Sequence, residues 1–388
     1  MRATVAMTEA LARHASLSPL VNYALKGLGN CWMPEHGLFS HSYHLGGAAP
    51  GNLSKADSDP FYSLNVLLGL SRLPRHGQAS EFDVEGIFDT ATRALLRPGV
   101  PKYAFGMALW TSAELGLELP ADTHQRVTGL LADEPAYRQF TAQDLGMLLS
   151  GCVARARHGD DAFAAIAKRL RGVLEADFDG PPSRLFYNNA HGPRRRYTSF
   201  ATCTYLTLAL YQYGEWQGDE RAIARANDGV AALIARQGPH GEWPWFFHAP
   251  SGRVLDMYEV YAVHQNGMAP AFLHHAVTHG VSGARDALER GFRWILGDNQ
   301  LGRSMLVPEL GLICRSQMRR GQGRARRAFR ALANDLFSRN DQLQTDDQIE
   351  IRQECRSYQL GWLLWSFAGR DDYPALTGHP AFLPSERQ

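Results

Sequence analysis

The chain has few cysteines, almost no net charge and no long apolar run. Its five cysteines (Cys31, Cys152, Cys203, Cys314 and Cys355) are scattered and form no CxxC pair, which argues against a disulfide framework or a zinc knuckle. With 40 basic and 39 acidic residues, no overall field favours nucleic acid or an anionic membrane. No apolar run reaches the length of a membrane span, and residues 1–20 lack the apolar core of a signal peptide. We therefore predict a cytoplasmic protein.

Strand-like alternation is also scarce, and helical patterns take its place. They come in pairs, in which a more polar first helix precedes a more apolar second helix. The predicted pairs are residues 18–30 with 60–73, 81–96 with 101–116, 121–132 with 141–157, 160–176 with 198–214, 219–236 with 257–279, and 282–296 with 349–369. Because each apolar second helix must pack against neighbours on both flanks, the pattern predicts an all-α fold, an (α/α)6 toroid. We expect a single domain over residues 1–388 with a long insertion at about 298–348.

The connections between the predicted helices differ in length. Those from a first helix to its second helix are often long, as in residues 31–59, 177–197, 237–256 and 297–348, whereas the others are short. All the long loops therefore emerge on one face, at the N-terminal ends of the second helices. Long loops inside compact domains are usually functional, so we place the site on this face.

Aromatic residues mixed with carboxylates, amides, arginines and histidines gather in these loops. Such a mixture suits a sugar, whose C–H faces stack on rings while its hydroxyls need polar partners. The predicted substrate-binding residues are Trp32, Tyr187, Asn188, Asn189, Arg196, Trp243, Trp245, Tyr261, Gln265 and Arg356. A structural role is the alternative for Trp243 and Trp245, which could cap the core. The basic stretch 315–330 is interpreted as a solvated or mobile surface segment.

The predicted helix 257–279 carries polar residues on an otherwise apolar pattern. Tyr258, Tyr261 and Gln265 follow at spacings of three and four, so a regular helix would place them on one face. These residues would lie near the face where the long loops emerge. There they would either line a water-filled cavity or form a closed hydrogen-bond network.

Two kinds of chemistry fit the residues of this face. Hydrolysis of a glycosidic bond needs two carboxylates across the scissile bond, and the candidates are Glu242 or Glu259 as proton donor with Asp57 or Asp59 as base. Elimination or epimerisation at a uronate needs a proton carrier and a group that neutralises the carboxylate. For that chemistry the candidates are Tyr187, His191, Tyr258, Tyr261 and His264 with Arg196. Hydrolysis is slightly favoured, because its acidic candidates come from two loops.

No cofactor and no metal are predicted. His36, His41 and His44 lie in a glycine-rich loop without a recognised zinc-binding pattern.

The six helix pairs resemble the (α/α) toroid carbohydrate-active enzymes, namely the six-hairpin glycosidases, the toroid polysaccharide lyases and the uronyl epimerases. The segment YNNAHGPRRRY (187–197) is similar to the Asn/His/Arg/Tyr clusters of toroid lyases. In those enzymes Asn and Arg neutralise a uronate carboxylate, and His or Tyr moves the neighbouring proton. The resemblance implies an enzyme that acts on an oligosaccharide or polysaccharide.

A second resemblance lies at residues 229–243, GVAALIARQGPHGEW. This piece is similar to the QW motif of squalene-hopene-type terpene cyclases, in which Gln and Trp tie a helix end to a turn. Those cyclases protonate with a DxDD motif, which this sequence lacks, so we interpret the piece as a structural device of the toroid. A terpene cyclase-like enzyme and a non-enzymatic toroid that binds a glycan or a protein are the remaining alternatives.

Overall fold

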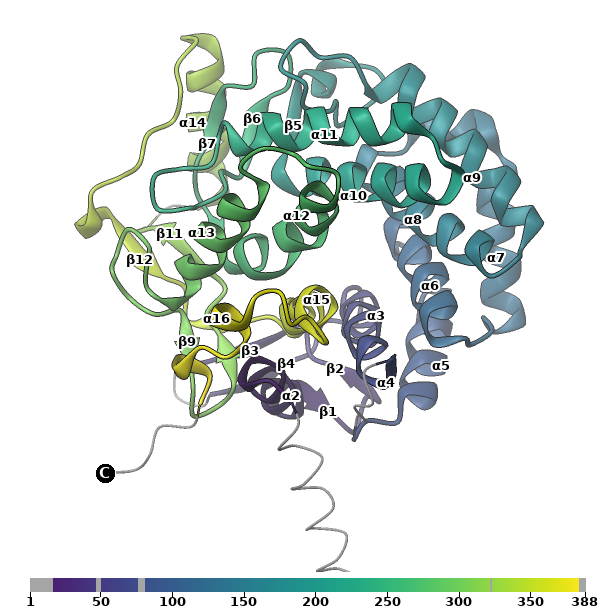
Figure 1. Cartoon of the computed structure of the whole chain (residues 1–388), viewed down its shortest axis with the longest axis horizontal. Helices are drawn as coiled ribbons and strands as arrows, with labels where there is room; N and C mark the ends of the chain where they lie inside the picture. Colours follow the sequence, from purple (N-terminus) through teal and green to yellow (C-terminus); the bar gives the residue numbers. More distant parts are fainter. Residues whose placement is uncertain (1–16, 47–49, 76–80, 322, 384–388) are drawn as a thin grey trace, which may run out of the picture.

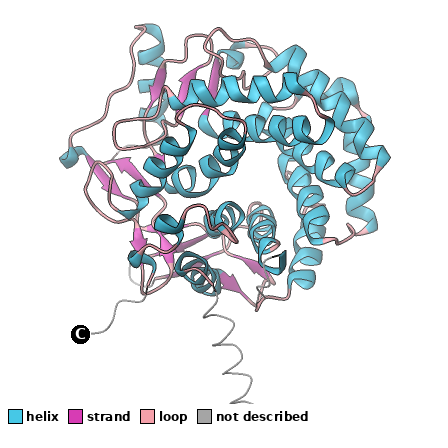
Figure 2. Ribbon diagram, in the orientation of Figure 1, coloured by secondary structure: helices cyan, strands magenta, loops and turns pink. Residues whose placement is uncertain are grey.

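The computed structural model describes residues 17–46, 50–75, 81–321 and 323–383. Most of the N-terminal segment in which no signal peptide is predicted lies outside these residues. The helices run around the molecule in two rings, an inner and an outer one (Figure 1, Figure 2). No described helix is long and apolar enough to cross a membrane.

The inner ring is closed. Its helices are α3 (Asp59–Leu70), α6 (Lys102–Leu115), α8 (Ala142–Arg157), α10 (Phe200–Gln217), α12 (Ala269–Thr278) and α15 (Ser357–Phe367). Each packs against the next, and α15 returns to α3. Helices in this position are flanked on both sides, which explains why α3, α6 and α10 are apolar nearly all round.

The outer ring is more polar. Its helices are α2 (Pro19–Cys31), α5 (Val84–Ala94), α7 (Ala121–Ala132), α9 (Asp161–Val173), α11 (Glu220–Ile234) and α13 (Ala284–Leu296). Aspartates begin three of them, since Asp83, Asp160 and Asp219 each accept a hydrogen bond from a backbone N–H of the first turn. Together the two rings confirm the predicted (α/α)6 toroid.

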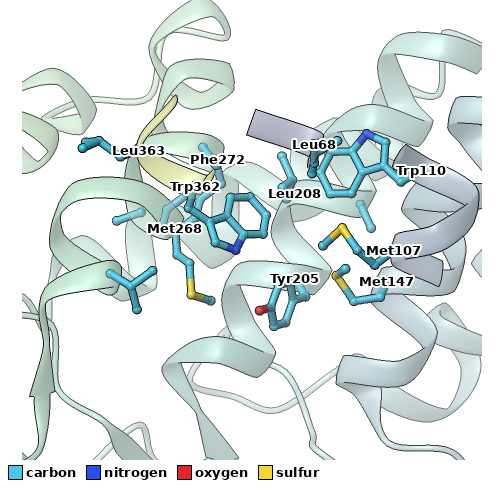
Figure 3. Close-up of a cluster of buried hydrophobic side chains, with 14 of the residues drawn as sticks. Leu68, Met107, Trp110, Met147, Tyr205, Leu208, Met268, Phe272, Trp362 and Leu363 are labelled. Carbon is cyan, nitrogen blue, oxygen red and sulfur yellow. The ribbon is translucent and has the colours of Figure 1, made fainter. Parts of the chain in front are cut away.

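Large side chains of the inner helices fill the centre of the ring. Trp110 and Trp362 meet edge to face at 6.1 Å, and Tyr205 and Met268 lie beside them (Figure 3). Glycine lets α6 and α8 approach closely, because a Cβ on Gly106 would lie 2.4 Å from backbone atoms of α8. Because side chains fill the centre of the ring, we look for a site at the end of the toroid where the long loops meet.

Short strands join the long loops to one another. They are β1 (Trp32–Met33), β2 (Leu38–Phe39), β3 (Ser42–His44), β4 (Gly51–Leu53), β5 (Tyr197–Ser199), β6 (Phe246–His248), β7 (Val254–Asp256), β8 (Val260–Tyr261), β9 (Leu306–Val307), β10 (Leu312–Ile313), β11 (Ser316–Arg319), β12 (Ile349–Ile351) and β13 (Glu354–Cys355). The three-stranded sheets have the orders β13-β3-β4, β12-β11-β8 and β5-β6-β7. Each sheet combines strands from two different long loops. The predicted loops therefore do meet.

Two inner helices begin later than their sequence pattern predicts. Residues 257–261 are not helical, because β8 pairs with β11 in a register that sets Tyr261 opposite Ser316. A π-helical turn, His264–Met268, then leads into α12. Similarly, residues 349–355 form β12 and β13 ahead of α15. The prediction that Tyr258, Tyr261 and Gln265 share one helical face is therefore wrong.

The basic stretch is also ordered differently from its prediction. It contains β11 and most of a further helix, α14 (Arg324–Leu336), which packs against β7 at the edge of the molecule (Figure 1). Arg319 of β11 is buried and forms ion pairs with Asp256 and Asp341. The interpretation as a solvated segment is wrong for this part, since the arginine has one carboxylate partner in the preceding long loop, Asp256, and one further along its own loop, Asp341.

Candidate functional site

A cavity of about 420 Å³ lies where the loops meet, a size suited to a small ligand. Its lining residues are His41, Lys55, Tyr62, Glu259, Tyr261, Arg315, Met318, Gly323, Arg327, Arg352 and Arg356. Five of these side chains are basic. Among the described lining residues, Glu259 is the single carboxylate. The cavity thus combines strong positive charge with two tyrosines.

A larger groove of about 670 Å³ lies between α2 and the residues before α5. Its wall is more apolar and includes Leu25, Trp32 and Phe82. Convergent charged and aromatic groups are a better mark of a catalytic site than volume, so we place the site at the smaller cavity.

Glu259 holds two arginines of the cavity in place. Its Oε1 accepts a hydrogen bond from Arg327 Nη1 at 3.0 Å, and Arg352 Nη1 lies 3.3 Å from both of its oxygens. Ser316 Oγ donates to Oε2 at 2.8 Å, because the pairing of β8 with β11 brings the two residues together. Both carboxylate oxygens are therefore engaged.

Glu354 holds a second group of arginines. Its Oε1 lies 2.6 Å from both Arg315 Nη1 and Arg356 Nη2, and Arg352 Nε is 3.4 Å from Oε2. Burial alone would raise the pKa of Glu354, but Arg315 and Arg356 outweigh it and lower this pKa to about 2. The carboxylate stays ionised near neutral pH and does not serve as a proton donor.

His41 supports Arg356. Its ring stacks on Tyr62 with 5.0 Å between centroids, its Nε2 contacts Arg356 Nη1, and its Nδ1 lies 2.6 Å from Ser58 Oγ. Burial, followed by the positive charge of Arg356, lowers the pKa of His41 to about 3. The neutral ring accepts from the guanidinium through Nε2 and donates to Ser58 through Nδ1. With both nitrogens engaged, His41 orients Arg356.

Aromatic rings form the remaining wall. Tyr62, in the first turn of α3, lies 4.5 Å from Tyr358 between centroids. Burial raises the pKa of Tyr62 although Arg356 and Arg315 oppose this, so the phenol stays protonated. Tyr261 meets Trp245 edge to face at 5.1 Å and has the Arg315 guanidinium 5.2 Å from its ring centre. Rings of this kind offer stacking surfaces for a sugar.

The site residues predicted in the segment 237–265 lie at different distances from the cavity. Glu259 and Tyr261 line the cavity, and Trp245 backs Tyr261. His264 is buried between Phe200 and Trp245, and its pKa falls to about 3 through burial. Gln265 is fully buried, and the Tyr258 hydroxyl donates to Gln300. Of the predicted residues elsewhere, Arg356 reaches the cavity.

The other predicted carboxylates lie apart from the described cavity lining. Glu242 is buried in the turn after α11, where its Oε2 accepts from the His240 backbone at 2.8 Å. Asp59 begins α3 and accepts from Ser54 Oγ at 2.6 Å and from the Lys55 backbone at 2.7 Å. Asp57 is exposed. Glu242 and Asp59 thus fix local backbone geometry.

The site residues predicted in the segment 187–197 also lie outside the described lining of the cavity. Arg195 covers the Tyr187 ring at 3.9 Å, and Asn188 donates to the Asn189 side chain at 2.9 Å. Arg196 forms an ion pair with Asp335 of α14 at 3.1 Å, and His191 is exposed.

The QW-like piece braces the fold. Gln237 donates to the backbone oxygens of Gly241 and Ala287, each at 2.9 Å, and so ties the end of α11 to the turn and to α13. Trp243 is fully buried in the core. These contacts support its interpretation as a structural device.

Sequence reasoning missed most of the cationic lining. Lys55, Arg315, Arg327 and Arg352 are not among the residues predicted for the site, and the basic stretch that contains Arg315 and Arg327 is typical of a solvated segment. Tyr62 gave one signal, as a polar aromatic residue in the first turn of an apolar inner helix. Among the described residues, no group of three or more His, Cys, Asp or Glu side chains is placed to hold a metal ion.

Fold and site together define an (α/α)6 toroid with a cationic, tyrosine-lined cavity at its loops. No protein-family model matches the chain, and a search of curated proteins finds no match. Solved structures of the same fold include a sugar epimerase from a ruminal bacterium (10% identity, 90% of this chain and 96% of that one, TM-score 0.59). Others are an α-1,6-mannanase of a Salegentibacter species (11%, 89% and 97%, 0.56) and a cellobiose 2-epimerase from Bacillus thermoamylovorans (10%, 70% and 83%, 0.52). At these identities the likeness shows the fold.

Proposed function

We propose that the protein is a carbohydrate-active enzyme that removes a proton next to the carboxylate of an acidic sugar, as a lyase or an epimerase does. The observation that carries the proposal is the cavity lining, whose described residues include five basic side chains, two tyrosines and a single carboxylate that is bound by arginines. The fold's likeness to sugar epimerases and glycoside hydrolases supports a carbohydrate substrate.

The arginines and tyrosines have distinct roles in this proposal. Guanidinium groups bind the sugar carboxylate, often through two hydrogen bonds, and neutralise the charge that builds up when the adjacent carbon loses its proton. Tyr261 takes that proton, because it lines the cavity beside the guanidinium of Arg315, which lies over its ring. Tyr62, kept protonated by burial, supplies a proton.

The proton supplied by Tyr62 decides the product. Delivered to the same carbon from the opposite face, it gives the epimer. Delivered to the departing glycosidic oxygen while the carbon–oxygen bond breaks, it leaves a double bond conjugated to the carboxylate. Neither outcome changes the oxidation state of the substrate as a whole. No external oxidant or reductant is required.

Hydrolysis of a glycosidic bond is the second candidate. Several similar structures are glycoside hydrolases, and Glu259 lines the cavity. This reaction would need a second carboxylate across the bond, from Asp57 or another loop. In either case we propose an oligosaccharide or polysaccharide substrate and a cytoplasmic location.

The test offers neutral and uronate-containing oligosaccharides to the purified protein in heavy water. We expect either the ultraviolet absorbance of a conjugated double bond, or deuterium at the carbon next to the carboxylate without chain cleavage. Tyr261→Phe should lower the rate by about a hundredfold or more, the usual contribution of a proton carrier.

The matched control is Tyr43→Phe, which removes a hydroxyl from β3 outside the described cavity lining. It should leave the rate unchanged. New reducing ends without absorbance or deuterium would establish hydrolysis and reject the proposal. A Tyr261→Phe variant with full elimination or epimerisation activity would reject the assignment of the proton carrier.

A further inference from the structure

An ordinary surface helix turns its apolar side towards the protein. Helix α14 instead turns its polar side towards the body of the protein. Arg327 pairs with Asp256 at 3.2 Å and with Glu259 at 3.0 Å. About two turns further on, Asn334 donates to the Leu255 backbone oxygen at 3.1 Å and Asp335 accepts further hydrogen bonds. These contacts anchor α14 along its length.

The outward side of α14 is apolar. Phe329 is 74% exposed, Leu332 59% and Leu336 76%, and Phe337 follows at the helix end with 63%. Among the described residues these are four of the seven exposed large hydrophobic side chains. A gathering of this kind within nine residues marks an interaction surface, because single apolar residues on a surface are otherwise scattered.

The spacing of the outward residues fits another helix. Ala325, Phe329, Leu332 and Leu336 follow at steps of four, three and four, the pattern of a seam between two packed helices. At 3.6 residues per turn they fall within about 60° of the helix surface, while Arg327 and Asn334 point to the opposite side. The seam and the anchored side are thus separate.

We propose that α14 packs antiparallel against α14 of a second copy of this chain. The seam is symmetric about the midpoint between Arg330 and Ala331, so a two-fold axis there sets Phe329 against Leu332 of the partner subunit and Ala325 against Leu336 of the partner subunit. Ala328 and Ala333 flank the seam and allow close approach. Ala328 then faces Ala333 of the partner subunit and Arg330 faces Ala331 of the partner subunit, so this arrangement opposes no like charges.

The pairing also bears on the cavity. Arg327, on the anchored side of α14, lines the cavity and binds Glu259. Covering the apolar side with a second copy favours the docked position of α14, and with it the position of Arg327. Because a single helix pair is small beside the roughly 1,200–2,000 Å² of a standard interface, we expect a dimer that dissociates on dilution.

Sedimentation velocity over roughly 1 to 100 µM tests the pairing, the range in which a small interface dissociates. We expect wild-type protein to move from monomer to dimer with increasing concentration. Phe329→Glu should raise the dissociation constant by about tenfold or more, as loss of a central apolar contact does. Leu96→Glu, at a 41% exposed leucine elsewhere, is the matched control and should dimerise as wild type.

A charge-pair rescue tests the antiparallel register. Leu332→Lys alone should weaken the dimer, whereas Phe329→Glu combined with Leu332→Lys should restore it, since each glutamate then faces a lysine of the other copy. Circular dichroism verifies that every variant is folded. The proposal is overturned if wild type stays monomeric throughout, or if Phe329→Glu leaves the dimer unchanged. It is also overturned if monomeric wild type floats with anionic vesicles and Phe329→Glu does not, because the surface would then bind lipid.

Discussion

Replacing Glu354 by glutamine should destabilise the protein in a pH-dependent way. Glu354 is buried and contacts Arg315, Arg352 and Arg356. Its pKa falls from an ordinary 4.5 to about 2 in the folded protein. One pKa unit corresponds to about 1.4 kcal/mol, so the ionised carboxylate contributes roughly 3 kcal/mol near neutral pH.

The sign of the pH dependence follows from the direction of this pKa change. Because the folded state binds a proton on Glu354 less readily than the unfolded state, the contribution is complete above about pH 4.5 and disappears as the pH falls towards about 2. The glutamine variant lacks this contribution at every pH. The difference in unfolding free energy between the two proteins should therefore shrink as the solution is acidified.

Urea unfolding of wild type and Glu354→Gln, measured from about pH 7 down to about pH 3, checks this expectation. Glu309→Gln, at an exposed glutamate, is the matched control and should change stability by less than about 0.5 kcal/mol. A difference for Glu354→Gln that stays constant over the whole pH range would refute the electrostatic reasoning. So would a difference below about 1 kcal/mol near neutral pH.

Two further changes test packing and buried charge. Gly106→Ala should destabilise by about 1–3 kcal/mol, because the new Cβ would lie 2.4 Å from α8 backbone atoms, whereas Gly129→Ala, with open space around it on α7, should stabilise by about 0.5–1 kcal/mol. Thermal unfolding compares the two, and equal effects would contradict the close approach of α6 and α8. Arg319→Met should cost about 3–5 kcal/mol, since it removes the guanidinium that Asp341 and Asp256 share and leaves the buried Asp341 without an arginine, while Asp256 keeps Arg327; a loss below about 1 kcal/mol in urea unfolding would contradict this ion-pair assignment.

The ring of helices could be predicted because its signal is local. A period of 3.6 residues and the contrast between polar outer and apolar inner helices are both visible within a single segment. The start of α12 was mispredicted for the opposite reason. Tyr261 joins a strand whose partner, Ser316, is far along the chain, and this pairing overrides the helical pattern.

The cationic lining was missed for a related reason. Arg327 stands in a basic stretch, and its carboxylate partners Asp256 and Glu259 lie about 70 residues earlier in the chain. A run of arginines without nearby acids looks solvated, and only the folded loops reveal the pairs. The sequence places Glu259, Tyr261 and Arg356 among its candidate site residues, but it does not indicate that they share one cavity.

Glu259 provides a test of whether the position or only the net charge of the cavity groups determines activity. If the net charge of the cavity alone determines affinity, removing a negative charge from it should strengthen the binding of an anionic sugar. Glu259, however, fixes the guanidinium groups of Arg327 and Arg352, and groups already in position stabilise a developing charge best. We therefore expect Glu259→Gln to bind the acidic sugar at least as tightly by calorimetry while its kcat falls by about tenfold or more. A kcat that rises together with affinity would show that charge alone matters, and would remove the positioning role of Glu259.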